Sequence, residues 1–292
     1  MKICCACKTE FNAETWQCPF CGKEPAKQDG FYVFAPSLAE RNEHYNPAFF
    51  EELASLEEGN FWFRARNRLI LWVFGRRFSE AVSVLEIGCG TGYVLQALRR
   101  GFPKTRFVGS EIFMGGLLCA ARRIPRKNLI QLDAGALPYR GEFGVVGCFD
   151  VLEHVEDDSR VLGEISLALV PGGGLMVTVP QHQALWSVND EESRHVRRYA
   201  RSELERKLKA AGFRVAWATS FVSLLLPAMA AARLVGKLCR PTAAGVLGEL
   251  RISPILNWAF GAVMTLERFL ISCGLTFPAG GSLFVVAYKD RS

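Results

Sequence analysis

From Val82 onward the chain alternates short β-type runs with helical stretches, and this rhythm limits the possible folds more than any other feature. Strands that alternate with helices need crossover connections, which place the strands parallel in one sheet and the helices on both of its faces. The sequence therefore predicts an α/β fold with a doubly wound, seven-stranded, mostly parallel sheet. The expected strands are 82–87, 106–112, 128–133, 145–150, 175–179, 215–219 and 283–288, and the expected helices are 93–100, 115–123, 159–169 and 201–211.

Composition divides the 292 residues into three parts. Residues 1–30 are polar and rich in cysteine, which predicts a small zinc ribbon. Residues 31–78 are rich in aromatic side chains and predict a helical lead-in that caps the following domain, residues 79–292. The connection 221–281, between the sixth and seventh expected strands, is so long that it needs structure of its own. Its apolar residues recur near helical spacing and predict a hydrophobic helical hairpin inserted before the last strand.

A glycine-rich turn follows the first expected strand, with glycines at Gly88, Gly90 and Gly92. Glycines there let the backbone approach a ligand, and the helix that follows offers free N–H groups. A dinucleotide fingerprint would need its third glycine at position 93, which is Tyr93. Glu86, just before the turn, would repel a pyrophosphate but could hold an ammonium group. The residues therefore favour a ligand that carries a zwitterionic amino acid.

The run Glu-Ile-Gly-Cys-Gly-Thr-Gly at 86–92 resembles the first motif of class I S-adenosylmethionine (SAM)-dependent methyltransferases. The resemblance implies that SAM is the cofactor and that the turn encloses its methionine part. It also implies that Glu111 accepts hydrogen bonds from the ribose hydroxyls and that Asp133 and Ala134 contact the adenine. The cofactor-binding residues that it implies are Glu86, Gly88, Gly90, Gly92, Glu111, Ile112, Asp133, Ala134 and Asp150.

The same resemblance places Asp150, Glu153 and His154 beside the reactive sulfonium as candidate catalytic residues. Methyl transfer needs an aligned acceptor, and a base only if the acceptor carries a proton. His154 is the candidate base, because histidine titrates near neutral pH. Alternatively, the three residues hold a divalent cation, as the similar segment does in some ubiquinone-pathway O-methyltransferases, or they only hydrogen-bond the loop. No Asn-Pro-Pro-Tyr or Asp-Pro-Pro-Tyr follows the fourth strand, which disfavours an amine acceptor and favours oxygen.

A polar loop follows the fifth expected strand, and its pattern Trp-x3-Asp followed by His-x-Arg-Arg-Tyr resembles a subgroup of small-molecule methyltransferases related to the ubiquinone type. In that subgroup the loop borders the acceptor pocket. The resemblance implies that the acceptor is contacted by Trp186, Asp190, His195, Arg198 and Tyr199, with arginine favouring a carboxylate or phosphate. A polar loop that only caps a helix is the alternative interpretation.

The amino-terminal cysteines form two CxxC pairs separated by ten residues, and the expected metal ligands are Cys4, Cys7, Cys18 and Cys21. Two such knuckles let four thiolates converge tetrahedrally on zinc. Iron in a rubredoxin-like site and a redox dithiol are the competing interpretations. A closed four-sulfur site predicts a structural metal, which folds a small appendage or binds a partner such as RNA.

Partners and location follow only weakly from composition. The net charge of +6 favours anionic partners mildly, and the absence of a clustered basic stripe disfavours nucleic acid without excluding it. Apolar helices with a basic margin at 221–270 could contact an anionic membrane interface or a lipid-like acceptor, or pack on protein. The apolar run 221–232 is too short to cross a bilayer. The chain start lacks a secretory pattern, so a cytoplasmic protein is expected, with or without membrane association.

In the lead-in, Trp62, Arg64 and Arg66 could shield the sulfonium or pair with the methionine carboxylate of the cofactor. Capping of the sheet by the aromatic rings, with a solvated arginine face, is the alternative. The leading functional prediction is an enzyme that methylates a small organic acceptor, at oxygen. The alternatives are an RNA or protein methyltransferase that docks through the zinc ribbon, and a non-catalytic adaptor that retains the cofactor fold.

Overall fold

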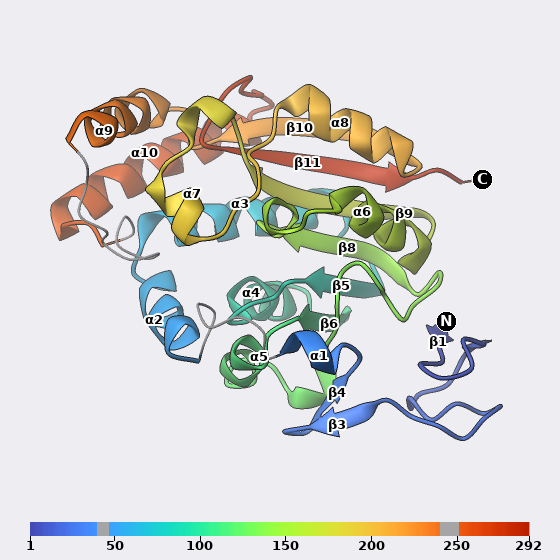
Figure 1. Cartoon of the computed structure of the whole chain (residues 1–292). Helices are drawn as coiled ribbons and strands as arrows, with labels where there is room; N and C mark the ends of the chain where they lie inside the picture. Colours follow the sequence, from blue (N-terminus) through green and yellow to red (C-terminus); the bar gives the residue numbers. More distant parts are fainter. Residues whose placement is uncertain (40–46, 240–250, 292) are drawn as a thin grey trace.

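The computed structural model describes residues 1–39, 47–239 and 251–291. A nine-stranded sheet with the order β10-β11-β9-β8-β5-β6-β7-β4-β3 forms its centre (Figure 1). Its strands are β3 (Ala26–Gln28), β4 (Phe31–Val33), β5 (Ser83–Ile87), β6 (Arg106–Glu111), β7 (Leu129–Gln131), β8 (Phe143–Phe149), β9 (Leu169–Pro180), β10 (Phe213–Phe221) and β11 (Ser282–Lys289).

Seven of these strands match the seven expected from the sequence, and the doubly wound, mostly parallel sheet is confirmed. From β5 the chain adds β6 and β7 on one side, then returns to add β8 and β9 on the other side. The strand β11 is antiparallel to both β9 and β10. The order of the parallel strands reverses between β5 and β8, and ligands of such sheets bind outside the carboxyl ends of the strands at this point.

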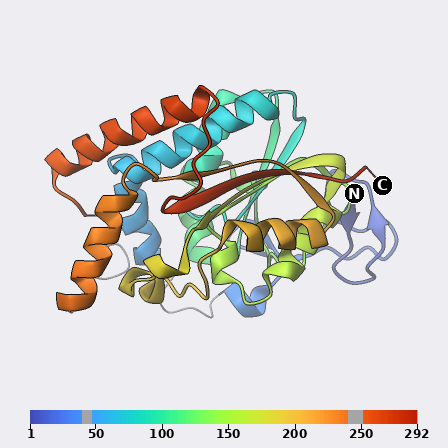
Figure 2. The ribbon, with the colours of Figure 1, turned by 90° about the horizontal axis from the view of Figure 1, so that it is seen from above.

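Helices cover both faces of the sheet (Figures 1 and 2). Their apolar residues join two separate hydrophobic cores, one on each face. One face carries α3 (Phe61–Arg77), α4 (Tyr93–Gly101), α5 (Met114–Ala120) and α10 (Pro254–Ser272), and the other carries α6 (Asp158–Ala168) and α8 (Arg201–Ala210). The remaining helices are α1 (Pro36–Ala39), α2 (Pro47–Glu57), α7 (Val188–Glu192) and α9 (Leu226–Cys239).

The amino-terminal region extends the main sheet instead of standing apart from it. Its first two strands, β1 (Lys2–Ile3) and β2 (Glu10–Phe11), form a separate hairpin. The next two join the central sheet, because β4 pairs in parallel with β7. Trp16 is buried against Tyr139, with ring centroids 5.4 Å apart. The boundary expected at residue 30 therefore falls within a hairpin of the main sheet.

The long connection between β10 and β11 contains α9 and α10, as helical periodicity predicted. The helix α10 packs lengthwise on α3 (Figure 2). Asn257 joins the two: its Oδ1 accepts a hydrogen bond from the Phe61 N–H at 2.7 Å, and its Nδ2 donates to the Gly59 carbonyl at 2.9 Å. The insert is therefore attached to the lead-in helix. None of the described helices combines the length and the apolar character that a membrane span requires.

The side chain of Gln131 ties the amino-terminal region to the end of β6. Its Oε1 accepts a hydrogen bond from the Ala35 N–H, and its Nε2 donates to the carbonyls of Ala35 and Ile112, each at 2.9 Å. Gln131 is fully buried, so these three backbone groups have no water to replace the amide.

We predict that Gln131→Leu lowers the free energy of unfolding by about 2–4 kcal/mol, because it leaves several buried polar groups unsatisfied. Chemical denaturation of purified protein measures the change. Gln28→Leu is the matched control, since Gln28 is exposed on the edge strand β3. Equal free energies of unfolding for the two variants would show that the Gln131 amide does not stabilise the fold.

Candidate active site

The glycine-rich turn lies at the carboxyl end of β5, where the strand order reverses. Gly88, Gly90 and Gly92 all have positive φ angles, 65°, 51° and 75°. A Cβ atom at Gly88 would lie 2.5 Å from Cγ2 of Val151, which follows β8. Glycine at this position thus lets the turn pass close to the end of the neighbouring strand.

Glu111 locks this turn to the end of β6. Its Oε2 accepts a hydrogen bond from the Gly90 N–H at 3.0 Å, and its Oε1 accepts from the N–H groups of Ile112 and Phe113 at 2.8 and 3.1 Å. Burial raises the pKa of Glu111, and the three backbone donors oppose that shift by stabilising the carboxylate. Glu111, the residue predicted to bind the ribose, is therefore held rigidly beside the turn.

Glu86 lies in β5, directly before the turn, and is also buried. Its Oε2 has no hydrogen-bond partner among the described residues. Burial raises the pKa of Glu86 to about 8; Glu57 and Glu111 add to the shift, and Arg66 opposes it. An unpartnered carboxyl group in this place suits a ligand that brings a positive charge, such as an ammonium group.

Arg66 of α3 joins the lead-in to the end of β8. Its Nε lies 2.8 Å from Oδ2 of Asp150, and its Nη2 donates to the Phe149 carbonyl at 3.3 Å. Its guanidinium lies 5.0 Å from the centre of the Trp62 ring. Asp150 itself has a left-handed φ of 56°. The structure thus brings Trp62 and Arg66 of the predicted lead-in set to the site, whereas Arg64 faces α10.

A buried ion pair that the sequence did not reveal connects α2 to the turn. Thr91 Oγ1 donates to Glu57 Oε1 at 2.5 Å, and Arg123 Nη1 donates to Glu57 Oε2 at 2.5 Å and to Thr91 Oγ1 at 2.8 Å. Glu57 and Thr91 are both buried. Because these residues come from three distant parts of the chain, no local pattern could have paired them. They hold the turn against the end of α2.

The predicted adenine contacts lie on the turn after β7. Asp133 Oδ1 accepts a hydrogen bond from the Gly135 N–H at 2.9 Å, and Asp133 and Ala134 are both partly exposed. Arg160 of α6 donates to the Gly135 carbonyl at 2.7 Å and fixes this turn from the other face. The predicted cofactor residues therefore follow four neighbouring parallel strands at the same edge of the sheet.

Glu153, His154 and His195 come together beside the end of β8. Their ligand atoms lie within 4.8 Å of one another, and the two imidazole rings meet edge to face with centroids 4.7 Å apart. Burial and the nearby Asp150 raise the pKa of Glu153, and its Oε2 has no hydrogen-bond partner among the described residues. Burial and His195 lower the pKa of His154 to about 3, although part of the residue stays exposed.

This cluster differs in one member from the predicted catalytic set, because Asp150 pairs with Arg66 while His195 joins Glu153 and His154. One carboxylate and two imidazoles are a suitable donor set for a divalent cation. A neutral imidazole at this place can also accept a proton.

Asp190 organises the loop after β9. It is fully buried, and its Oδ1 lies 2.8 Å from both His195 Nδ1 and Arg198 Nε. Its Oδ2 accepts from the N–H and hydroxyl groups of Ser187 at 2.9 and 3.1 Å. Burial opposes ionisation, but the bonds from His195 and Arg198 prevail and lower the pKa of Asp190 to about 2. The carboxylate therefore fixes the orientation of the His195 ring.

The other predicted acceptor residues divide by exposure. Tyr199 is fully buried, and its hydroxyl donates to Asp158 Oδ2 at 2.7 Å. Arg198 is nearly buried and also donates to the Gln181 carbonyl. Trp186 keeps partly exposed surface and donates from Nε1 to Glu191 at 3.3 Å. Asp190, Arg198 and Tyr199 thus form the frame of the loop.

The four predicted cysteine ligands converge at the amino terminus. Cys4 and Cys21 have their Sγ atoms 3.6 Å apart, and those of Cys7 and Cys18 are 3.7 Å apart. All four sulfurs lie within 4.8 Å of one another. The N–H groups of Ala6 and Cys7 point at the Cys4 sulfur at 3.4 Å, as expected for a thiolate that binds a metal. Cys5, the alternative ligand, is exposed and outside this group.

Known proteins resemble this chain in sequence and in fold. A family model described as a methyltransferase domain matches residues 38–216. A probable S-adenosylmethionine-dependent methyltransferase of Mycolicibacterium smegmatis is 28% identical over 56% of this chain and 63% of its own length. The ubiquinone biosynthesis O-methyltransferase of Psychrobacter arcticus is 33% identical over 31% of this chain and 37% of its own length. The chain therefore spans less than two thirds of these relatives.

Solved structures show the same fold at lower identity. The [4+2]-cyclase SpnF superposes with a TM-score of 0.52 at 20% identity, covering 79% of this chain and 84% of its own. A SAM-dependent methyltransferase of Thermotoga maritima gives a TM-score of 0.50 at 16% identity, covering 85% of this chain and 99% of its own.

The family match covers the glycine-rich turn, the carboxylates of β5 and β6 and the cluster after β8, which together form the site described above. The chain belongs to the methyltransferase-domain family, as a class I S-adenosylmethionine-dependent member.

Proposed function

We propose that this protein transfers the methyl group of SAM to an oxygen atom of a small organic acceptor. The observation that carries the proposal is the unpartnered, buried carboxyl group of Glu86 beside the glycine turn, with the Glu111 carboxylate fixed at the next strand. The Glu86 carboxyl group suits the ammonium group of the cofactor, and the Glu111 carboxylate suits its ribose hydroxyls. A relative named for ubiquinone biosynthesis supports a small acceptor.

SAM would bind along the carboxyl edge of the sheet and would supply a methyl group activated by its positive sulfonium. In the proposed arrangement the turn surrounds the methionine part, and Arg66, which pairs with Asp150, is the residue proposed to bind its carboxylate. The residues proposed to hold the cofactor are Glu86, Gly88, Gly90, Gly92, Glu111, Ile112, Asp133, Ala134 and Asp150. Since Glu111 is already fixed by three backbone donors, it needs no rearrangement to receive the ribose.

The cluster of Glu153, His154 and His195 is proposed to orient the acceptor. Burial lowers the pKa of His154 to about 3, so its ring is neutral at physiological pH but only a weak base, and it is proposed to accept a hydrogen bond from an acceptor hydroxyl. The same three side chains could instead hold a divalent cation that binds the acceptor oxygen directly. In both cases His195 and Trp186 contact the acceptor, while Asp190, Arg198 and Tyr199 position them.

We further propose that the four-cysteine group binds a structural zinc ion and that the insert at 221–270 contacts a membrane surface or a lipid-like acceptor. The convergence of the sulfurs of Cys4, Cys7, Cys18 and Cys21 within 4.8 Å of one another supports the first. The large exposed apolar side chains of α10 support the second.

The first of three predictions about function tests methyl transfer. Purified protein with labelled SAM and a cell extract should give labelled small-molecule product. Replacing His195 by Ala, or Arg198 by Lys, should lower turnover by about 100-fold or more, because the acceptor is no longer aligned. SAM affinity, measured by calorimetry, should stay unchanged. Arg201→Ala, an exposed change on α8, is the control. Unchanged turnover in both variants would remove the loop from the acceptor site, and no labelled product would favour an adaptor.

The second prediction concerns pH. Because the pKa of Glu86 in the free protein is raised to about 8, this group is mostly protonated at pH 6 and must lose its proton to pair with an ammonium group. SAM affinity should therefore rise between pH 6 and 7.5, by up to about tenfold per pH unit. Glu86→Gln should bind more weakly and show no such slope. A wild-type affinity independent of pH would contradict the role of Glu86.

The third prediction concerns the metal. The purified chain should hold one equivalent of zinc by elemental analysis, and chelation should lower the thermal unfolding midpoint of the whole protein. The reason is that Trp16, between the cysteine pairs, packs on the main core. Cys18→Ser should have the same effect, whereas Cys273→Ser, at an exposed cysteine outside the cluster, should not. Iron in place of zinc, or an unchanged midpoint after metal removal, would refute a structural zinc site.

A further inference from the structure

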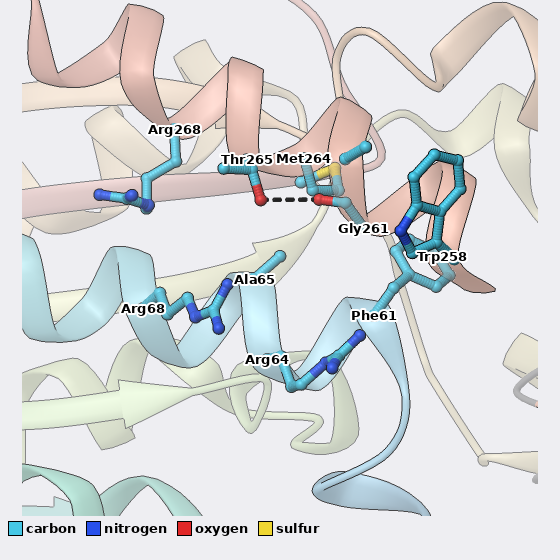
Figure 3. A pocket seen from close by; sticks show the side chains of 10 residues that line it. Phe61, Arg64, Ala65, Arg68, Trp258, Gly261, Met264, Thr265 and Arg268 are labelled. Atoms are coloured by element: carbon cyan, nitrogen blue, oxygen red, sulfur yellow. Dashed lines mark hydrogen bonds between the residues drawn. The ribbon is translucent and has the colours of Figure 1, made fainter.

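A groove between α3 and α10 gathers three arginines on the outer side of the lead-in helix (Figure 3). It encloses about 240 Å³ and is lined by Arg64 and Arg68 of α3 and by Trp258, Thr265 and Arg268 of α10, among others. The would-be Cβ position of Gly261 lies 3.7 Å from Arg64 Nη2, so glycine lets the two helices approach each other here. We call this the α3–α10 groove.

The charge of the groove is not balanced within the described part of the chain. No acidic residue lines it, and none of its three arginines forms a described ion pair. By contrast, Arg66 on the same helix pairs with Asp150, and Arg251, just before α10, pairs with Glu52. Guanidinium groups bind phosphate oxygens through paired N–H donors. The groove therefore suits an anion that carries phosphate oxygens.

An exposed apolar stripe on α10 continues from the groove. Its members are Ile255, Trp258, Leu266 and Phe269, which recur at helical spacing and are 78%, 74%, 52% and 57% exposed. Trp258 belongs to both the stripe and the groove. Aliphatic and aromatic side chains next to unpaired arginines are typical of helices that lie in the interface of an anionic bilayer.

We propose that the α3–α10 groove and the α10 apolar stripe dock the protein on an anionic phospholipid membrane. Lipid phosphates enter the groove, and the stripe inserts among the upper parts of the acyl chains. A nucleic acid would not bury the exposed apolar side chains of Ile255 and Leu266. A symmetric contact with a second copy centred on the groove would bring the unbalanced guanidinium groups of both copies together, which costs free energy.

The position of the groove determines where the proposed cofactor site lies when the protein is docked on a membrane. Figure 1 shows α2, α9 and the first turns of α10 at the edge where the parallel strands end, which is the edge of the proposed cofactor site. The helix α3 separates the groove from the site: Arg64 and Arg68 face α10, and Arg66 faces Asp150. Docking therefore holds this edge of the sheet near the bilayer without using any residue proposed to bind the cofactor.

Flotation with lipid vesicles tests the proposal. Full-length protein should float with phosphatidylcholine vesicles that contain 30% phosphatidylglycerol, should not float with pure phosphatidylcholine, and should be released by salt. The triple variant Arg64→Gln, Arg68→Gln, Arg268→Gln should bind the anionic vesicles at least about tenfold more weakly, since each basic residue contributes to surface binding. Trp258→Ala should also weaken binding, with little change in salt dependence.

The matched control removes the same charge from the other face of the protein, through Arg206→Gln, Lys209→Gln and Arg214→Gln, which are exposed on α8 and β10. This control should float like the wild type. SAM affinity and the unfolding midpoint, measured for every variant, should not change, so a failure of the cofactor site is recognised separately.

Three outcomes would overturn the proposal. Wild-type protein that stays unbound with anionic vesicles at low salt would exclude docking. Equal loss of binding in both triple variants would show that total charge, and not the groove, attracts the lipid. A dimer that dissociates on Trp258→Ala, in protein that does not float, would assign the stripe to a second copy of the chain.

Discussion

Three backbone N–H groups converge on the carboxylate of Glu111, and the geometry of the cofactor edge depends on this contact. It joins the glycine turn after β5 to the backbone that follows β6. A buried carboxylate without such donors would be costly, and the turn would lose its anchor without the carboxylate. Gln131 extends the same edge by joining the segment after β4 to Ile112. The sheet, the turn and the amino-terminal region are thereby fixed relative to one another before any ligand binds.

The sequence predicted those features that depend on local spacing. The seven strands, the helices between them, the glycine turn and the four converging cysteines were all recognisable, because each is encoded by neighbours along the chain. The sequence did not reveal that β3 and β4 join the main sheet. They are three-residue strands, too short to show a period, and the pairing of β4 with β7 spans almost one hundred positions, from Tyr32 to Ile130.

The composition of the site was only partly predictable for the same reason. His195 meets His154 and Glu153 although it lies in a different loop, and Asp150 is instead turned to Arg66 of α3. The ion pair of Glu57 and Arg123 likewise joins the end of α2 to the turn after α5. Sequence motifs identified residues of the site, whereas the packing of the folded chain decided which of these side chains contact each other. Asp190, Arg198 and Tyr199 illustrate this: their motif suggested acceptor contacts, but their side chains are enclosed in the loop itself.

The helix α3 connects the two surfaces that the proposals concern. One side of it reaches the end of β8 through Arg66, and the other side carries Arg64 and Arg68, two of the three arginines of the α3–α10 groove. A class I methyltransferase core thus carries an amino-terminal four-cysteine module on one edge of its sheet and a helical insert on one face.

The site beside the glycine turn is proposed to hold an aminoacyl nucleoside and not a dinucleotide. Crystals of the protein grown with S-adenosylhomocysteine, and parallel crystals grown with NADH, distinguish the two ligands. We expect the first ligand to lie beside the turn, with its ribose on Glu111 and its ammonium group on Glu86, and the second not to bind. Electron density for no ligand in the first crystal, or for NADH in the second, would refute this assignment.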